Sequence, residues 1–147
     1  MFRTFIETDS LERASSGAIW GNVWHEMDGM HFPHGGWNDM IVPYVTALAE
    51  GVCEALSGGK AEVDFFDGPL GVEMLPVGPR IRIVAIVPEG SPGLAPCCTG
   101  RADLAADVLK QGELLLDACE QRGWSLDNDV RRLGLVLGWL REDLPPV

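Results

Sequence analysis

The densest group of side chains capable of chemistry lies between His25 and Asp39. It contains all three histidines of the chain, His25, His31 and His34, together with nearby carboxylates. Imidazole and carboxylate groups are ligands for zinc and other divalent ions. The spacing does not match the His-Glu-x-x-His pattern of a zinc-binding helix. A metal-dependent or hydrolytic enzyme that uses these histidines and Asp39 is therefore an alternative interpretation, and ordinary surface or hydrogen-bonded histidines are the simpler one.

Asp64 and Asp67 are the best candidates for catalysis by carboxylates. They flank Phe65 and Phe66 at the end of an extended run, where apolar neighbours can raise the pKa of a carboxyl group. The sequence Asp-Gly-Pro at 67–69 is also typical of a turn, in which the aspartate side chain bonds to its own backbone. The turn is the simpler interpretation. The chain has neither a Gly-x-Ser-x-Gly nucleophile motif nor a glycine-rich loop for binding phosphate.

Four cysteines and five tryptophans complete the chemically distinctive residues. No cysteine pair has the spacing of a zinc site, so we expect free thiols. Cys53 and Cys119 fall on the apolar stripes of predicted helices and should pack in the core. Cys97 and Cys98 lie in a segment rich in proline and glycine that is predicted to be a loop. We expect about three of the five tryptophans to pack in the core.

The elements that must position these residues follow from the hydrophobic pattern. Residues 1–16 are predicted to form a short helix or strand, residues 17–27 a strand, and residues 28–39 a loop. A helix capped by Asn38 or Asp39 should follow and end near residue 57.

Three extended runs come next, at 61–66, 70–75 and 80–87, and their short connections predict an antiparallel meander. A long helix is predicted from residue 101 to 122, and a last helix should begin at a cap on Ser125. The pattern therefore predicts an α+β fold, with an antiparallel sheet of about four strands and helices packed on one face.

Length and charge limit the possible functions. The chain has 147 residues, 22 of them acidic and 11 basic, and a net charge of −11, which predicts one globular domain over residues 1–147. An acidic chain without a basic stretch is not expected to bind nucleic acid. No apolar run approaches the ~18 residues of a membrane span, and the polar N-terminal segment does not resemble a secretory signal. We therefore expect a cytoplasmic protein that attracts basic partners.

Two motifs resemble those of an uncharacterised bacterial family. One is the segment Phe-Pro-His-Gly-Gly-Trp-Asn-Asp at 32–39, which fits Phe-Pro-x-x-x-Trp-x-Asp, and the other is Phe-Phe-Asp-Gly-Pro at 65–69. The family usually has Met and Tyr where this chain has Phe66 and Leu70. Its members look like the small acidic immunity proteins that accompany secreted bacterial toxins. The resemblance implies inhibition by binding, with no catalysis and no cofactor.

The leading hypothesis is therefore a protein-binding module, most concretely an inhibitor of a basic toxin domain. Its binding candidates are Trp37, Asp39, Asp64 and Asp67. The same residues also suit structural roles, because Trp37 can pack beneath a loop and Asp39 can cap the following helix. A structural subunit of a cytoplasmic assembly uses the same residue types, so it remains a further alternative. The oligomeric state is not determined by the sequence.

Overall fold

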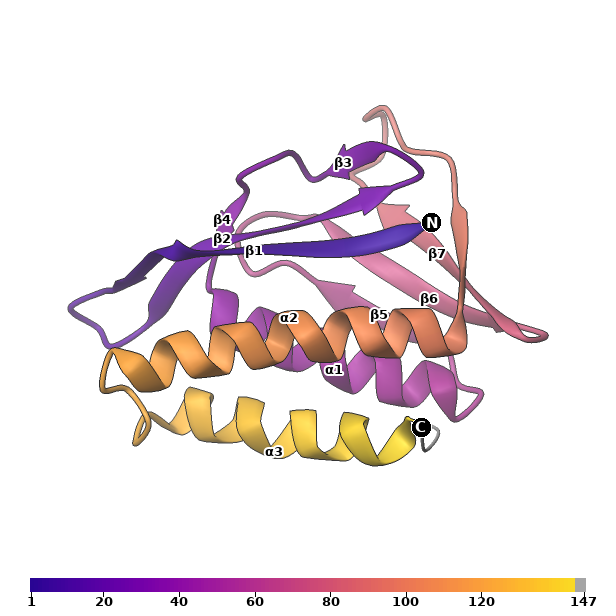
Figure 1. Cartoon of the computed structure of the whole chain (residues 1–147). Coiled ribbons are helices and arrows are strands. Elements are labelled where there is room, and N and C mark those ends of the chain that lie inside the picture. Colours follow the sequence, from indigo (N-terminus) through magenta and orange to yellow (C-terminus); the bar gives the residue numbers. More distant parts are fainter. Residues whose placement is uncertain (145–147) are drawn as a thin grey trace.

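Two antiparallel sheets of four strands each surround a central helix (Figure 1). The structure is a computed structural model that describes residues 1–144, so residues 145–147 of the expected domain lie outside it. Its strands and helices confirm the predicted α+β class, although the expected antiparallel sheet of four strands occurs twice. Within the described residues, no helix is long and apolar enough to cross a membrane.

The first sheet is built from the N-terminal 39 residues. Its strands are β1 (Phe2–Arg13), β2 (Ile19–Met27), β3 (Met30–Phe32) and β4 (Asn38–Asp39). Strand β2 pairs with all three others, and every second residue of β2 is buried, as expected for a strand with one face on the core. The prediction of a loop over residues 28–39 was wrong in part, because β3 and β4 form there by pairing with β2.

The second sheet is the predicted meander. Its strands are β5 (Ala61–Asp64), β6 (Gly71–Val77), β7 (Arg80–Ile86) and β8 (Cys97–Gly100), in that order. The three predicted runs are confirmed as β5, β6 and β7. The expected loop position of Cys97 and Cys98 was wrong, because both lie in β8, which pairs with β7.

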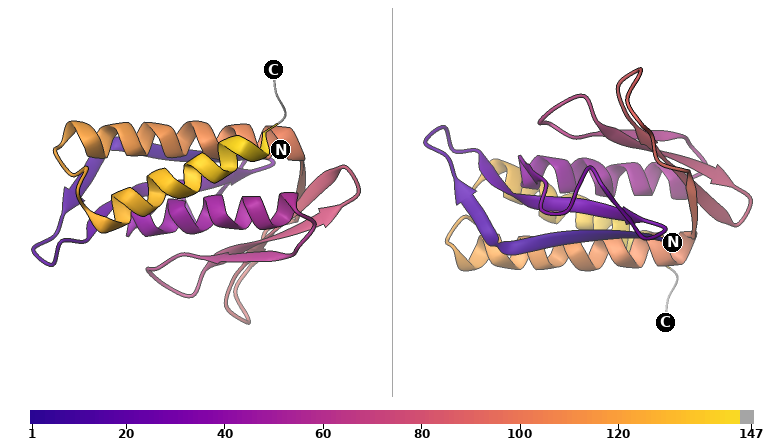
Figure 2. Two further views of the ribbon diagram at one scale, coloured as in Figure 1. Left: turned by 90° about the horizontal axis from the view of Figure 1, so that it is seen from below. Right: turned by 90° about the horizontal axis from the view of Figure 1, so that it is seen from above.

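Three helices cover the inner faces of the sheets. Helix α1 (Ile41–Leu56) contacts strands of both sheets, α2 (Arg101–Gln121) packs along β1, and α3 (Asn128–Asp143) packs across α1 and α2 (Figure 2). The predicted cap of the last helix was wrong. Asp127, not Ser125, is its N-cap, and the carboxylate accepts hydrogen bonds from the N–H groups of Asp129 and Val130.

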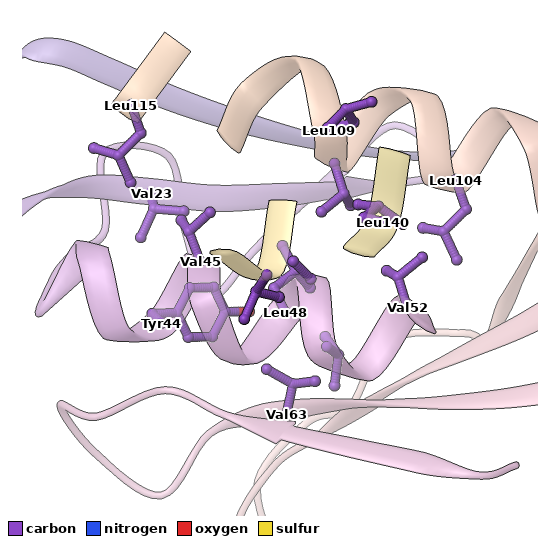
Figure 3. Packing of buried hydrophobic residues seen from close by; sticks show 14 of the residues in the cluster. Val23, Tyr44, Val45, Leu48, Val52, Val63, Leu104, Leu109, Leu115 and Leu140 are labelled. Carbon is purple, nitrogen blue, oxygen red and sulfur yellow. The ribbon is translucent and has the colours of Figure 1, made fainter. Parts of the chain in front are cut away.

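One continuous hydrophobic core joins these layers. Helix α1 supplies Tyr44, Val45, Leu48 and Val52, which meet side chains from both sheets and from the other helices (Figure 3). Val23 reaches α1 from the first sheet, and Val63 reaches it from the second sheet. Burial on both sides explains why α1 is the most apolar helix of the chain, and it fixes the two sheets relative to each other.

Polar side chains of α2 and of its C-cap residue Arg122 cover the free edge of β1. The carboxylate of Asp107 accepts a hydrogen bond of 2.8 Å from the N–H of Thr4, and the guanidinium of Arg122 donates one of 2.9 Å to the carbonyl of Leu11. These contacts satisfy backbone groups that an edge strand otherwise presents to other chains. Burial raises the pKa of Asp107 above its ordinary value.

Candidate functional site

Asp39 is a fully buried carboxylate at the junction of the two sheets. It lies at the end of β4, and its oxygens accept hydrogen bonds from Trp37 Nε1 at 3.0 Å and from the N–H of Met40 at 2.7 Å. They also accept from the N–H groups of Phe66 at 3.2 Å and Asp67 at 3.3 Å, in the loop between β5 and β6. Asp39 therefore ties the first sheet and the start of α1 to the loop of the second sheet.

The expected helix-capping role of Asp39 was wrong. Met40 occupies the N-cap position of α1, and no side chain caps that helix end. The expected self-contained turn at 67–69 is also replaced by a longer-range arrangement, because the backbone of Asp67 is held from outside by Asp39. The base of the loop is closed by a hydrogen bond from the N–H of Phe65 to the carbonyl of Leu70.

Aromatic rings pack on the core side of the loop between β5 and β6. Phe65 is buried and stacks on Tyr44 with ring centroids 4.2 Å apart, and Trp37 packs edge-on against Phe65 at 5.9 Å. Trp37 is half-buried and lies under the loop, as the sequence predicted. The ring of His34 packs edge-on against Trp37, with ring centroids 5.2 Å apart. These contacts pack the base of the loop between β5 and β6 against the core.

The loop presents a different set of residues to solvent. Asp64, Phe66 and Asp67 are exposed, and 51% of Phe66 is accessible. The four predicted binding residues thus divide into two groups: Trp37 and Asp39 are internal supports, while Asp64 and Asp67 lie on the surface. Sequence reasoning missed Phe66. The signal was present in the pair Phe65–Phe66, because neighbouring residues in extended backbone point to opposite sides and only one could be buried.

An apolar groove of about 400 Å³ opens beside this loop. The connection between β7 and β8, which forms one of its walls, runs at the same end of the molecule as β3 (Figure 1). Pro69 and Leu70 of the loop form part of its wall. The whole lining comprises His31, Phe32, Pro33, Pro69, Leu70, Val87, Pro88, Ser91, Pro92 and Leu94. Such a groove can receive apolar side chains of a ligand.

The structure does not bring the three histidines together. His25 lies on the inner face of β2, completely buried, with Nδ1 2.9 Å from Thr4 Oγ1 and Nε2 2.6 Å from the hydroxyl of Tyr44. Burial lowers the pKa of His25 to about 3, so the ring is neutral at pH 7. Both ring nitrogens of His25 have a hydroxyl group within hydrogen-bond distance. Burial also raises the pKa of Tyr44.

His31 and His34 are on the surface. His31 lies on the outer face of the first sheet, 3.4 Å from a carboxylate oxygen of Glu26, and its ring is next to those of Phe5 and Trp24. Nδ1 of His34 is 2.9 Å from the carbonyl of Gly35. Within residues 1–144, no three side chains of the His, Cys, Asp and Glu types are placed to hold a metal ion.

The tryptophans and cysteines follow the sequence expectation only in part. None of the five tryptophans is fully buried; Trp37 and Trp124 pack against the core, and Trp139 is exposed.

All four cysteines are free. Cys119 is buried and Cys53 is half-buried, and burial raises the pKa of each thiol to about 11. Their reactive thiolate form is therefore suppressed at neutral pH.

Comparison with known proteins adds no relative. No family model, no curated protein and no solved structure matches the chain. The surface around Phe66 therefore has to be interpreted from its own chemistry.

Proposed function

We propose that this protein is a protein-binding module that inhibits a bacterial toxin, in the manner of an immunity protein. The observation that carries the proposal is Phe66, an exposed aromatic side chain between the carboxylates of Asp64 and Asp67. Aromatic anchors surrounded by polar residues are typical of the side chains that dominate binding energy at interfaces. The carboxylates suit a partner that carries lysine or arginine around an apolar pocket.

The support beneath the loop favours this role. Asp39 fixes the backbone of Phe66 and Asp67 through hydrogen bonds, and Phe65 anchors the loop in the core. A loop that is already ordered loses little conformational freedom when a partner binds, so more of the contact energy appears as affinity. The groove beside Pro69 and Leu70 can take a neighbouring apolar residue of the partner.

The charge of the whole chain points to the same class of partner. With a net charge of −11, the protein accelerates its encounter with a basic domain. Binding alone would inhibit such a toxin by covering its active surface. No cofactor is needed for that mechanism.

The test is capture of the product of the neighbouring gene, combined with protection of growth. Tagged protein is used as bait for that product, and cells that express the toxin candidate are grown with and without this chain. We expect a stable complex and restored growth. A chain that captures only a metabolic complex at constant stoichiometry, and protects against no toxin, would contradict the proposal and favour a structural subunit.

A matched pair of variants locates the site. Asp64→Asn/Asp67→Asn neutralises the carboxylates beside Phe66, whereas Asp117→Asn/Glu120→Gln removes the same charge from exposed positions of α2. We expect the first pair to weaken capture and the second to have little effect. Equal weakening by both pairs would mean that the overall charge, and not this loop, determines binding.

A further inference from the structure

The outer face of α3 carries large apolar side chains without cover. The helix buries one face against the rest of the protein, through Val130, Leu133, Val136, Leu137 and Leu140. On the opposite face 52% of Leu135 and 42% of Trp139 are accessible. Seen from below, α3 lies in front of α1 and α2, and no other element of residues 1–144 covers it (Figure 2). Two large apolar residues one turn apart form a small patch suited to a partner helix.

The exposed tryptophan is held in place by its neighbours. The guanidinium of Arg132 lies 4.9 Å from the ring centroid of Trp139, and Arg132 Nη2 is 3.6 Å from a carboxylate oxygen of Glu50 on α1. A stacked arginine covers one face of the ring and restricts its orientation. Trp139 is therefore presented in a restricted orientation, which lowers the cost of burying it in an interface.

The ends of this face carry opposite charges. Arg131 lies one turn before Leu135, and Glu142 lies one turn after Gly138; both charged residues are exposed. The four residues share one stripe, because they are spaced by four, three and four positions. A β-carbon added at Gly138 would meet no atom within 4 Å, so the helix surface is open at that point.

Such a stripe is complementary to itself in the antiparallel direction. Consider a two-fold axis that is perpendicular to the helix and level with the midpoint between residues 136 and 137. In such a pair Arg131 faces the partner's Glu142, and Leu135 faces the partner's Gly138. Trp139 flanks this stripe on the side of α1, where Arg132 and Glu50 lie. Each charge thus meets its opposite, and each Leu135 meets a glycine, so the stripe has the self-complementarity that an isologous dimer requires.

We infer that α3 is the interface of an antiparallel homodimer of this protein. The occupant is a second copy, because Arg131 and Glu142 lie at matching positions of two antiparallel copies and Gly138 faces Leu135. One helix from each subunit is a small contact, and the net charge of −11 on each copy opposes association. The dimer should therefore be weak and reversible, with a dissociation constant on the order of 10–100 μM. The inference does not depend on the proposed toxin partner, whose candidate site is on the loop between β5 and β6.

The test is sedimentation of the full chain from about 5 to 500 μM, a range that brackets such a dissociation constant. We expect the native protein to pass from monomer to dimer over this range. Arg131→Glu and Glu142→Arg should each shift the transition to at least about tenfold higher concentration, because each leaves two like-charged pairs across the axis. The double variant Arg131→Glu/Glu142→Arg restores opposite charges and should dimerise like the native chain.

A matched control separates the interface from general charge effects. Arg82 is exposed on β7, and Arg82→Glu changes the net charge by the same amount as Arg131→Glu. We expect Arg82→Glu to dimerise normally, with unchanged circular dichroism in all variants because the altered side chains are exposed. A native chain that is monomeric throughout, or a double variant that fails to recover, would overturn the inference. Phe66→Ala should leave the oligomeric state unchanged, so this test and that of the proposed function fail independently.

Discussion

Asp39 is the residue on which the shape of the proposed binding surface depends. Its buried carboxylate accepts hydrogen bonds from Trp37 Nε1 and from the backbone of Met40, Phe66 and Asp67. In Asp39→Ala these donors lose their acceptor inside the protein. We expect the free energy of unfolding to fall by about 3 kcal/mol or more, measured by urea denaturation.

The matched control is Asp67→Asn, whose side chain is exposed. This change should alter stability by less than about 0.5 kcal/mol. Equal stability of the Asp39→Ala and Asp67→Asn proteins would show that the buried carboxylate does not hold the loop.

His25 gives the folded protein a specific sensitivity to acid. Burial lowers its pKa to about 3, whereas an unfolded chain has the ordinary value near 6.5. Between these two pH values the unfolded state binds more protons, so stability from this residue is complete above pH ~6.5 and falls as the pH decreases toward ~3. The slope from His25 is at most about 1.4 kcal/mol per pH unit.

The variant His25→Gln tests this dependence, because glutamine can bond Thr4 and Tyr44 but does not titrate. We expect the stability difference between native and variant proteins to shrink as the pH falls from 7 to 4, measured by chemical denaturation at each pH. A difference that stays constant over this range would exclude His25 as the cause of acid sensitivity.

At the scale of the elements, Arg101 joins the end of one helix to a turn of the second sheet. Its Nη1 donates to the carbonyls of Ala55 and Leu56 at the C-terminus of α1, and its Nη2 donates to the carbonyl of Gly78 at 3.0 Å. A cation at a helix C-terminus also interacts favourably with the helix dipole. We expect Arg101→Met to lower the free energy of unfolding by about 1–3 kcal/mol, read from thermal denaturation.

Arg101→Lys separates charge from geometry. Lysine keeps the positive charge but lacks the planar fork that reaches two chain segments. It should therefore recover only part of the stability. Full recovery by lysine would mean that the charge alone matters.

Elements with strong local patterns were predictable, and those held by distant pairing were not. Strand β2, the meander and α2 show their periodicity within one window of sequence. Strands β3 and β4 have three and two residues, and they exist because β2 supplies their hydrogen bonds. The pattern of residues 1–16 does not distinguish helix from strand, since β1 shifts register between Glu7 and Glu12 and this irregularity breaks its alternation.

The candidate site was predictable as a set of residues but not as an arrangement. The motif residues Trp37, Asp39 and Asp67 do meet. Whether each of these residues is buried depends on the hydrogen bonds from Phe66 and Asp67 to Asp39, which join residues 27 or 28 positions apart. The local spacing of residues carries no information on such contacts. The same reason explains His25, whose partners Thr4 and Tyr44 come from other elements.

At the scale of the whole molecule, the net charge of −11 should control the rate of partner binding. Ions screen this attraction over a Debye length of ~8 Å at physiological salt. We expect the association rate constant to fall on the order of tenfold or more between low and high ionic strength, whereas the dissociation rate changes little. Stopped-flow binding across a salt series measures both. An association rate indifferent to salt would mean that the acidic surface serves solubility alone.

The most direct measurement of the proposed function is a calorimetric titration of the toxin candidate with native protein, Phe66→Ala and Leu126→Ala. Leu126 is the matched control, because 78% of it is accessible and it lies in the connection between α2 and α3, outside the proposed site. We expect Phe66→Ala to weaken binding by about 2 kcal/mol or more, roughly 30-fold, and Leu126→Ala to bind like the native chain. Native affinity in Phe66→Ala would contradict the claim that this loop is the binding site.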